Sequence, residues 1–248
     1  MQIAVLGGSG TAGTATVAEL EARGHTVRVL ARRTGFDVTD PSTFDDALAG
    51  IATLVDTLGP TKTSGPEARA VLVDGLAAVL DAAAHAGVKH VVSLSIVGSD
   101  RIPMPYYALK QRQEAVVRAA PLPSTILRAT QFPELLDMVW SATRKAGIIP
   151  APRGVVAPID PRDVAVAIAD AVERGPATGE LIGIRGPETL TIRDLARTWK
   201  AARGSRRPVI GVPAVGGALR TVAGGALVDE SLPAATRTWA EWLAEHPA

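Results

Sequence analysis

The stretch that decides the fold is Ile3-Ala4-Val5-Leu6-Gly7-Gly8-Ser9-Gly10-Thr11-Ala12-Gly13, close to the start of the chain. Its four apolar residues predict a buried strand, and the segment 11–23 after the glycines predicts a helix. Gly7 permits a tight turn, Gly10 lets a pyrophosphate approach the backbone, and Gly13 lets the helix pack close to the sheet. The helix amino terminus also offers free N–H groups to phosphate. The stretch therefore predicts a dinucleotide-binding turn, although its GxxGxxG spacing departs from GxGxxG and a purely structural turn is the alternative.

Apolar runs alternate with longer helical segments through the first two-thirds of the chain. The predicted strands are residues 3–6, 26–30, 53–57, 88–94 and 124–127, and the predicted crossover helices are 11–23, 66–86 and 105–119. Strands without polar alternation are typical of a parallel sheet that is covered on both faces. The fold class is therefore α/β, a Rossmann-type doubly wound parallel sheet. The segment 31–39 is too short for a full further strand, so we expect the usual third strand to be stunted near Phe36.

Beyond Phe132 the pattern loosens into helices separated by Gly/Pro-rich connections. We expect helices at 133–145, 162–173, 192–202 and 233–245, and a mobile loop or lid at 211–225. Asp40-Pro41 and Asp160-Pro161 each place a carboxylate at an N-cap and proline at the first helical position. The predicted organisation is an NAD(P)-binding domain at 1–131 and a smaller, mainly helical substrate-binding region at 132–248, with strands partly shared.

Composition limits the partners. The 26 basic and 25 acidic residues leave a net charge of +1, which gives no footprint for nucleic acid or an anionic membrane. No apolar run reaches the length of a bilayer span and no leader pattern is present, so we expect a cytoplasmic protein. The chain has no cysteine, and its four histidines lack ligand spacing, so we expect no metal site. The oligomeric state stays open.

Two arginines bear on which dinucleotide is bound. NAD sites usually carry an acidic residue after the second strand, where it binds the ribose 2′-hydroxyl. This chain has Ala31-Arg32-Arg33 there. A guanidinium suits a 2′-phosphate, and Arg32 follows the strand immediately. The pattern favours NADP(H) over NAD(H), with a pair of solvated surface arginines as the alternative.

The chain resembles the short-chain dehydrogenase/reductase superfamily, and more narrowly its atypical NmrA-like branch of NAD(P)H-binding proteins. The resemblance spans nearly the whole chain; it lies in residues 3–13, 32, 36–38, 55–59, 91–98, 105–110, 126–132 and 158–163. It implies that the dinucleotide is bound by residues Gly7, Ser9, Gly10, Thr11, Ala12, Gly13, Arg32, Asp37, Val38, Leu58, Gly59, Lys110 and Phe132. Asp37 and Val38 would lie by the adenine, and Leu58 and Gly59 beside the dinucleotide.

Tyr106 and Lys110 form the candidate catalytic pair. Residues four apart lie on one face of a helix, so phenol and ammonium can converge on one site. We expect the ammonium to lower the phenol's pKa and to hold the nicotinamide ribose. In the superfamily a serine completes the site, and Ser95 is preferred here over Ser93. Ser95 stands closer in sequence to Tyr106 than is typical, and Tyr107 is a competing phenol.

The sequence therefore predicts an NADPH-dependent reductase of a carbonyl or quinone-type small molecule. The alternative from another class is a catalytically silent NADP(H)-binding redox sensor of NmrA type. A sugar-nucleotide epimerase is a third possibility, against which the short substrate region argues. The identity of the substrate does not follow from the sequence.

Overall fold

The computed structural model describes residues 1–59 and 62–247. Six parallel strands form the main sheet in the order β2-β1-β3-β4-β5-β8. Their bounds are β1 Gln2–Leu6, β2 Thr26–Leu30, β3 Thr53–Asp56, β4 His90–Ile96, β5 Ser124–Ala129 and β8 Glu180–Ile184. The predicted α/β fold with a doubly wound parallel sheet is confirmed.

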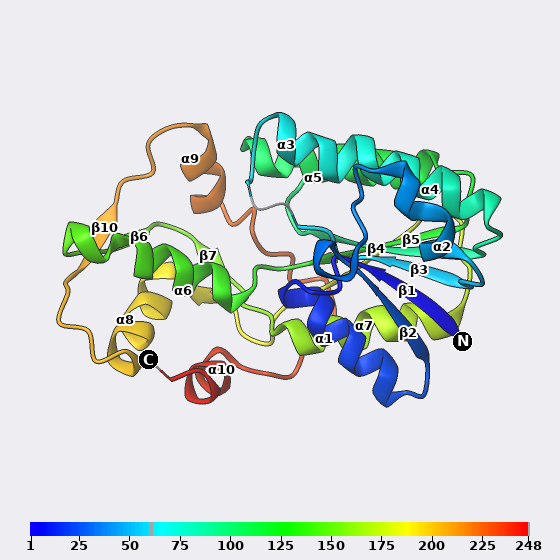
Figure 1. Cartoon of the computed structure of the whole chain (residues 1–248). Coiled ribbons are helices and arrows are strands. Elements are labelled where there is room, and N and C mark those ends of the chain that lie inside the picture. The colour runs from blue at the N-terminus through cyan, green and yellow to red at the C-terminus, as the bar shows by residue number, and fades with distance from the viewer. Residues whose placement is uncertain (60–61, 248) are drawn as a thin grey trace.

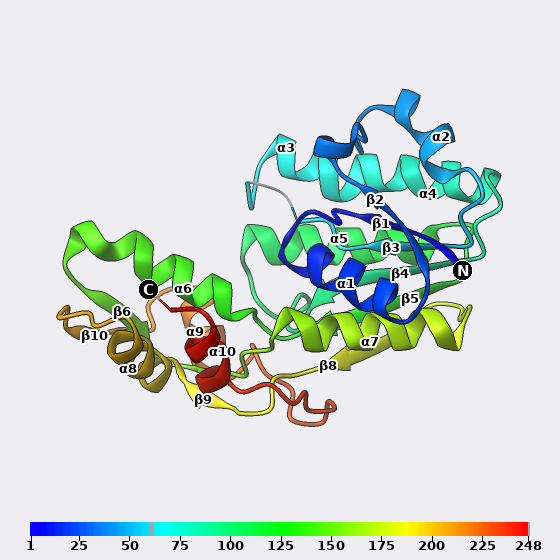
Figure 2. The same ribbon diagram turned by 60° about the horizontal axis from the view of Figure 1, so that its bottom comes forward.

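Helices cover both faces of this sheet (Figure 1). One face carries α1 (Thr11–Ala22) and α7 (Pro161–Arg174), which lie side by side in Figure 2. The other face carries α2 (Phe44–Leu48), α3 (Pro66–Arg69), α4 (Leu76–His85) and α5 (Pro105–Ala119). Alternate residues of each strand face the two layers. In β3, for example, Val55 packs under α7 while Leu54 packs under α4.

The expected gap after β2 is present. Residues Arg32–Thr34 form one turn of 3-10 helix, and no strand follows before Pro41–Thr43, another such turn. The predicted helix at 66–86 is interrupted by a π-helical turn at Ala70–Gly75. A Cβ on Gly75 would lie 2.5 Å from the carbonyl oxygen of Val38. The helix therefore packs directly against the backbone of the irregular segment 36–40.

The remaining elements form a second lobe (Figure 2). They are α6 Pro133–Ala142, a 3-10 turn at Thr143–Ala146, β6 Ile149–Pro152, β7 Val155–Val156, β9 Leu190–Thr191, α8 Ile192–Ala202, β10 Val209–Val212, α9 Gly217–Ala223 and α10 Trp239–Glu245. β6 pairs with β10 and β7 with β9. All four tryptophans lie in this lobe's core, with ring centroids 5.5–6.3 Å apart along Trp199–Trp140–Trp239–Trp242.

Several sequence-based expectations are corrected here. The segment 211–225, expected to be a mobile loop or lid, contains the end of β10 and the helix α9. The last helix begins at Trp239 instead of 233, because Thr238 and Glu241 form a capping box. β8 was not expected, and with α7 it brings residues 161–184 of the second predicted region onto the main sheet. None of the described helices is both long and apolar enough to traverse a bilayer.

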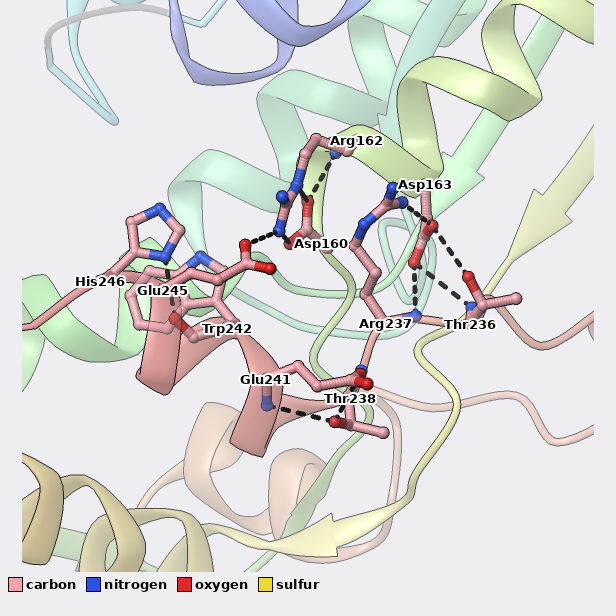
Figure 3. Close-up of polar contacts among 10 residues, drawn as sticks. All are labelled: Asp160, Arg162, Asp163, Thr236, Arg237, Thr238, Glu241, Trp242, Glu245 and His246. Atoms are coloured by element: carbon pink, nitrogen blue, oxygen red, sulfur yellow. Dashed lines mark hydrogen bonds and ion pairs between the residues drawn. The ribbon is translucent and has the colours of Figure 1, made fainter.

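A polar clasp ties the C-terminal segment to the start of α7 (Figure 3). Asp160 caps α7 and pairs with Arg162, which also reaches Glu245. Asp163, with a side chain 8% exposed, accepts hydrogen bonds from the backbone N–H of Arg237 at 2.9 Å and of Thr236 at 3.3 Å. Its other oxygen pairs with the Arg237 guanidinium. The clasp holds the chain that leads into α10 against the main sheet.

Replacing Asp163 with alanine is expected to lower the free energy of unfolding by about 2 kcal/mol, because a buried charged acceptor and an ion pair are lost. Urea unfolding followed by tryptophan fluorescence measures this change. Asp81→Ala is the matched control, since Asp81 is exposed on α4 and its carboxylate makes no hydrogen bond or ion pair with the described residues. Equal stability of the two variants would contradict the clasp.

Candidate active site

The glycine turn follows β1 at the carboxyl edge of the sheet. Gly7 has a φ of +70°, and a Cβ on it would lie 2.9 Å from the carbonyl oxygen of Thr57. A Cβ on Gly13 would lie 2.2 Å from the carbonyl oxygen of Gly7. Both positions therefore need glycine for close approach, and α1 starts directly against the end of β1.

Gly10 is different, because its Cβ position is nearly open. The single neighbour within 4 Å would be the carbonyl oxygen of Gly7, at 3.4 Å. Gly10 is the N-cap of α1 and has no side chain to cover the first N–H groups of the helix. Ser9, Gly10 and Thr11 are exposed, while Ala12 is buried. An open helix start of this kind can accept a phosphate group, and the predicted binding of a dinucleotide phosphate here stays a prediction.

The residues expected near the adenosine follow β2. Arg32 and Arg33 are exposed, and neither forms an ion pair within residues 1–59 and 62–247. Asp37 accepts hydrogen bonds from the backbone N–H of Thr39 at 2.9 Å and from its hydroxyl at 2.7 Å. These bonds, together with the nearby Arg32 guanidinium, hold the pKa of Asp37 below its usual value. Val38 is buried, and its carbonyl oxygen lies close to Gly75, at the end of the π-helical turn before α4.

A buried carboxylate, Asp56, ends β3 beside the turn. Strand register places it next to Leu6 on one side and Ser93 on the other. The carboxylate is 0% exposed and accepts the Ser93 hydroxyl at 2.7 Å and the Gln113 amide at 2.6 Å. The backbone N–H of Leu58 donates to its other oxygen at 3.0 Å. This bond shapes the Leu58–Gly59 backbone, which the sequence places beside the dinucleotide; Gly59 is exposed.

Lys110 lies in α5, over the same edge of the sheet. Its side chain is buried, at 4% exposure, and its ammonium donates to the carbonyl oxygen of Leu94 at 2.7 Å. Burial lowers the pKa of Lys110 to about 8, against the attraction of Asp56 and Glu114, which acts to raise it. The two carboxylates thus keep the ammonium form populated at neutral pH.

The two tyrosines at the start of α5 have different surroundings. Tyr107 is 7% exposed and packs in the core of the second lobe, and burial raises its pKa to about 12. Tyr106 is half-buried between that core and the Ala68–Leu72–Leu109 cluster. Burial, followed by the charge of Asp56, raises the pKa of Tyr106. The expectation that Lys110 lowers this pKa is therefore wrong: burial and Asp56 raise it.

Ser95, the preferred serine, donates its hydroxyl to Glu114 at 2.6 Å. Glu114 is 1% exposed and also accepts from Ser99, Arg118 and Arg128. Burial acts to raise the pKa of Glu114, but the hydrogen bonds from Arg128 and Ser95 outweigh it and lower that pKa to about 2. Ser93 and Ser95 are thus both turned to carboxylates, and the catalytic role of Ser95 stays a prediction.

Residues 130–132 border the site after β5. Thr130 donates its hydroxyl to the carbonyl oxygen of Ala157 at 2.6 Å and accepts from the N–H of Gly186 at 3.0 Å. Phe132 is the N-cap of α6 and packs partly against the apolar cluster between the main sheet and the helices α1 and α7. Phe132 therefore lies where the main sheet passes into the second lobe.

The sequence reading missed Asp56, Gln113, Glu114 and Arg128. A signal was available: Asp56 and Arg128 are charged residues in otherwise apolar strands, and Glu114 follows Lys110 by one helical turn. Which of them would meet depends on the packing of α5 across β3, β4 and β5. That packing does not follow from spacing along the chain.

This edge of the sheet has the layout of a dinucleotide-dependent oxidoreductase. Residues 7–174 match the NAD(P)H-binding family. The chain belongs to this family, so the predicted membership of an NAD(P)H-binding family is confirmed.

Individual relatives agree with this assignment. The (4-alkanoyl-5-oxo-2,5-dihydrofuran-3-yl)methyl phosphate reductase of Streptomyces griseus subsp. griseus is 30% identical over 226 residues, covering 84% of this chain and 75% of the reductase.

Solved structures share the fold. An NADPH-dependent quinone oxidoreductase from Escherichia coli, in complex with NADPH, has a TM-score of 0.74 at 20% identity, covering 98% of this chain and 99% of that one. The triphenylmethane reductase of Citrobacter sp., in complex with NADP(H), has a TM-score of 0.73 at 18% identity and covers 99% of both chains. At these identities the likeness concerns the fold alone.

Gly10→Ala and Gly13→Ala are expected to fail in different ways. The methyl group of Gly10→Ala would stand where the phosphate approaches, so dinucleotide binding should weaken by at least about tenfold while the fold is retained. Gly13→Ala should destabilise the fold itself, because its Cβ would overlap the Gly7 carbonyl. Calorimetric titration and thermal unfolding separate the two effects.

The control for this pair is Gly224→Ala, since its Cβ would also meet a backbone oxygen at 3.4 Å, far along the chain at the end of α9. It should bind the dinucleotide like the unaltered protein. Unchanged binding by Gly10→Ala would contradict the phosphate site.

Proposed function

We propose that this chain is an NADPH-dependent reductase of a carbonyl or quinone-type small molecule. The observation that carries the proposal is the state of Lys110. An ammonium has three N–H donors, yet one acceptor, the Leu94 carbonyl, is all that the described residues provide. A charged group buried to this degree is costly unless its donors are satisfied. The ribose hydroxyls of a nicotinamide nucleotide are suitable acceptors.

The site offers a proton donor for a reduction. The bound nicotinamide would supply a hydride to the substrate carbon, and the reduced oxygen then needs a proton. Burial raises the pKa of Tyr106, so its phenol is protonated at neutral pH but is a weak acid, and the ammonium of Lys110, one helical turn away, would have to stabilise the phenolate as the proton leaves. Tyr106 would deliver this proton, and Lys110 would orient the ribose. Asp56 acts through Lys110, because its negative charge favours the ammonium form.

The cofactor preference is part of the proposal. The exposed guanidinium of Arg32 would bind the 2′-phosphate of NADPH, whereas the carboxylate of Asp37 is engaged by Thr39. The first 131 residues would supply most of the dinucleotide site and residues 132–248 most of the substrate site. The S. griseus relative, named as a reductase of a lactone-containing phosphate, supports a small-molecule substrate with a conjugated carbonyl.

Tyr106→Phe is expected to lower kcat by about 100-fold or more, the usual contribution of a positioned proton donor. NADPH affinity should be retained, because the phenol does not hold the dinucleotide. A panel of quinones and conjugated carbonyls, followed by NADPH absorbance, measures this. Tyr107→Phe is the control and should stay within a few-fold of the unaltered kcat.

Turnover by Tyr106→Phe at the unaltered rate would contradict this role. If the unaltered protein binds NADPH tightly and reduces no member of the panel, the redox-sensor alternative is favoured.

Arg32→Ala is expected to weaken NADPH binding roughly 10- to 100-fold, the equivalent of one lost charge-assisted hydrogen-bonding pair. NADH binding should stay unchanged, since NADH lacks the 2′-phosphate. Calorimetry with both nucleotides measures the ratio, with Arg33→Ala as the neighbouring control. An equal loss of affinity for NADPH and for NADH would show that Arg32 does not bind the 2′-phosphate.

A further inference from the structure

A cavity of about 730 Å³ opens in the second lobe, away from the glycine turn. It is lined by the end of β6 with the turn after it, by the start of α8, and by the end of β10 with the residues that follow. Its volume falls within the roughly 300–1,000 Å³ typical of small-molecule sites. No residue proposed to bind the dinucleotide or to transfer the proton lines it.

The charge of the cavity lining is one-sided. Arg153 and Arg193 are its two ionisable lining residues, so the lining carries two positive charges and no negative one. Within residues 1–59 and 62–247, neither guanidinium forms an ion pair or a hydrogen bond to another side chain. The carboxylate of Asp194 accepts a hydrogen bond at 2.6 Å from Thr191, a lining residue, and pairs with Arg197 at 3.3 Å, so it does not neutralise Arg153 or Arg193 by direct contact.

Gly211 leaves room for one of the two arginines. A Cβ at this position would lie 2.7 Å from Nη2 of Arg193, so the guanidinium lies against the bare backbone of β10. Arg153 belongs to the turn between β6 and β7, a separate element. Both arginines are exposed, and both line the cavity.

Apart from Thr191, the rest of the lining is apolar side chain or glycine. Ala151 and Pro152 contribute from β6, and Val212, Pro213 and Ala214 from the β10 side. An inorganic anion alone would leave this part of the cavity unfilled. The cavity therefore suits a molecule with a doubly charged anionic group and a compact apolar body.

We propose that this cavity binds a small organic phosphate monoester, with its phosphate between Arg153 and Arg193 and its apolar part over Val212 and Pro213. Planar guanidiniums match phosphate oxygens through paired N–H donors, and two of them balance a phosphate dianion. The site is independent of the reductase chemistry, since it shares no residue with the proposed dinucleotide or proton-donor sites.

The test is calorimetric titration of the full chain with phenyl phosphate, repeated with inorganic phosphate and with NADPH present at saturation. We expect saturable binding of phenyl phosphate, weaker binding of inorganic phosphate, and no competition by NADPH. Arg153→Gln and Arg193→Gln should each weaken phenyl phosphate binding by about tenfold.

Gly211→Ala is the sharpest variant, because it displaces the Arg193 guanidinium and leaves every charge in the protein unchanged. It should weaken binding several-fold. The matched control is Arg197→Gln, which removes an exposed arginine of the same helix that lies outside the cavity lining. It should have no effect.

Three results would overturn the proposal. One is the absence of saturable binding of phenyl phosphate to the unaltered protein. Another is an equal loss in Arg197→Gln and Arg193→Gln, which would reduce the effect to bulk charge. The third is binding that NADPH displaces and Arg32→Ala abolishes, which would place the phosphate at the dinucleotide site. Each result leaves the test of reductase activity by Tyr106→Phe unaffected.

Discussion

The close approach of Gly13 to the Gly7 carbonyl is the constraint on which the rest of the structure depends. With 2.2 Å between that oxygen and any added Cβ, α1 can begin directly at the end of β1 only because both residues are glycine. α1 in turn packs along α7, and Arg23 at its end pairs with Asp170 and Glu173 of that helix. α7 then holds the C-terminal segment through Asp163. The phosphate-binding turn and the clasp of the second lobe are thus linked by one layer of helices.

The same helix, α5, carries two buried charges that differ in how fully they are satisfied. Glu114 accepts hydrogen bonds from Ser95, Ser99, Arg118 and Arg128, so its charge is neutralised within the protein. Lys110, one turn earlier, has one carbonyl acceptor among the described residues. A buried charge whose hydrogen bonds are all made within the protein, such as Glu114, fixes the packing of a helix on a sheet. A buried charge with unsatisfied donors, such as Lys110, leaves those donors for a ligand. This contrast is the reason why Lys110, and not Glu114, is assigned to the proposed dinucleotide site.

Sequence patterns predicted the parts of this fold that depend on local chemistry. The glycine turn, the five apolar strands and the caps at Asp40 and Asp160 all follow from residues within a few positions of one another. β8, Glu180–Ile184, was missed because Gly183 interrupts its short apolar run; the strand is half-exposed and lies at the sheet edge. The Asp56–Ser93–Gln113 cluster was missed because its members are brought together across three elements. Tyr106 and Lys110 were named as candidates, but the direction of the shift in the pKa of Tyr106 follows first from its burial between two apolar clusters and then from the charge of Asp56, and neither is visible in the spacing.

The segment 211–225 shows why glycine content misled the reading of the second lobe. Its glycines predicted a mobile loop or lid, yet it contains α9. This helix packs between the turn at Gly154 and the segment at Pro103. A Cβ on Gly154 would meet Val222 at 2.9 Å, and one on Gly98 would meet the carbonyl oxygen of Ala226 at 2.5 Å. Gly217 lies against Pro103, just before α5 begins. At these positions glycine permits close packing between segments of the chain. The segment that follows β10 is therefore positioned by contacts with residues distant in sequence, which glycine content alone does not predict.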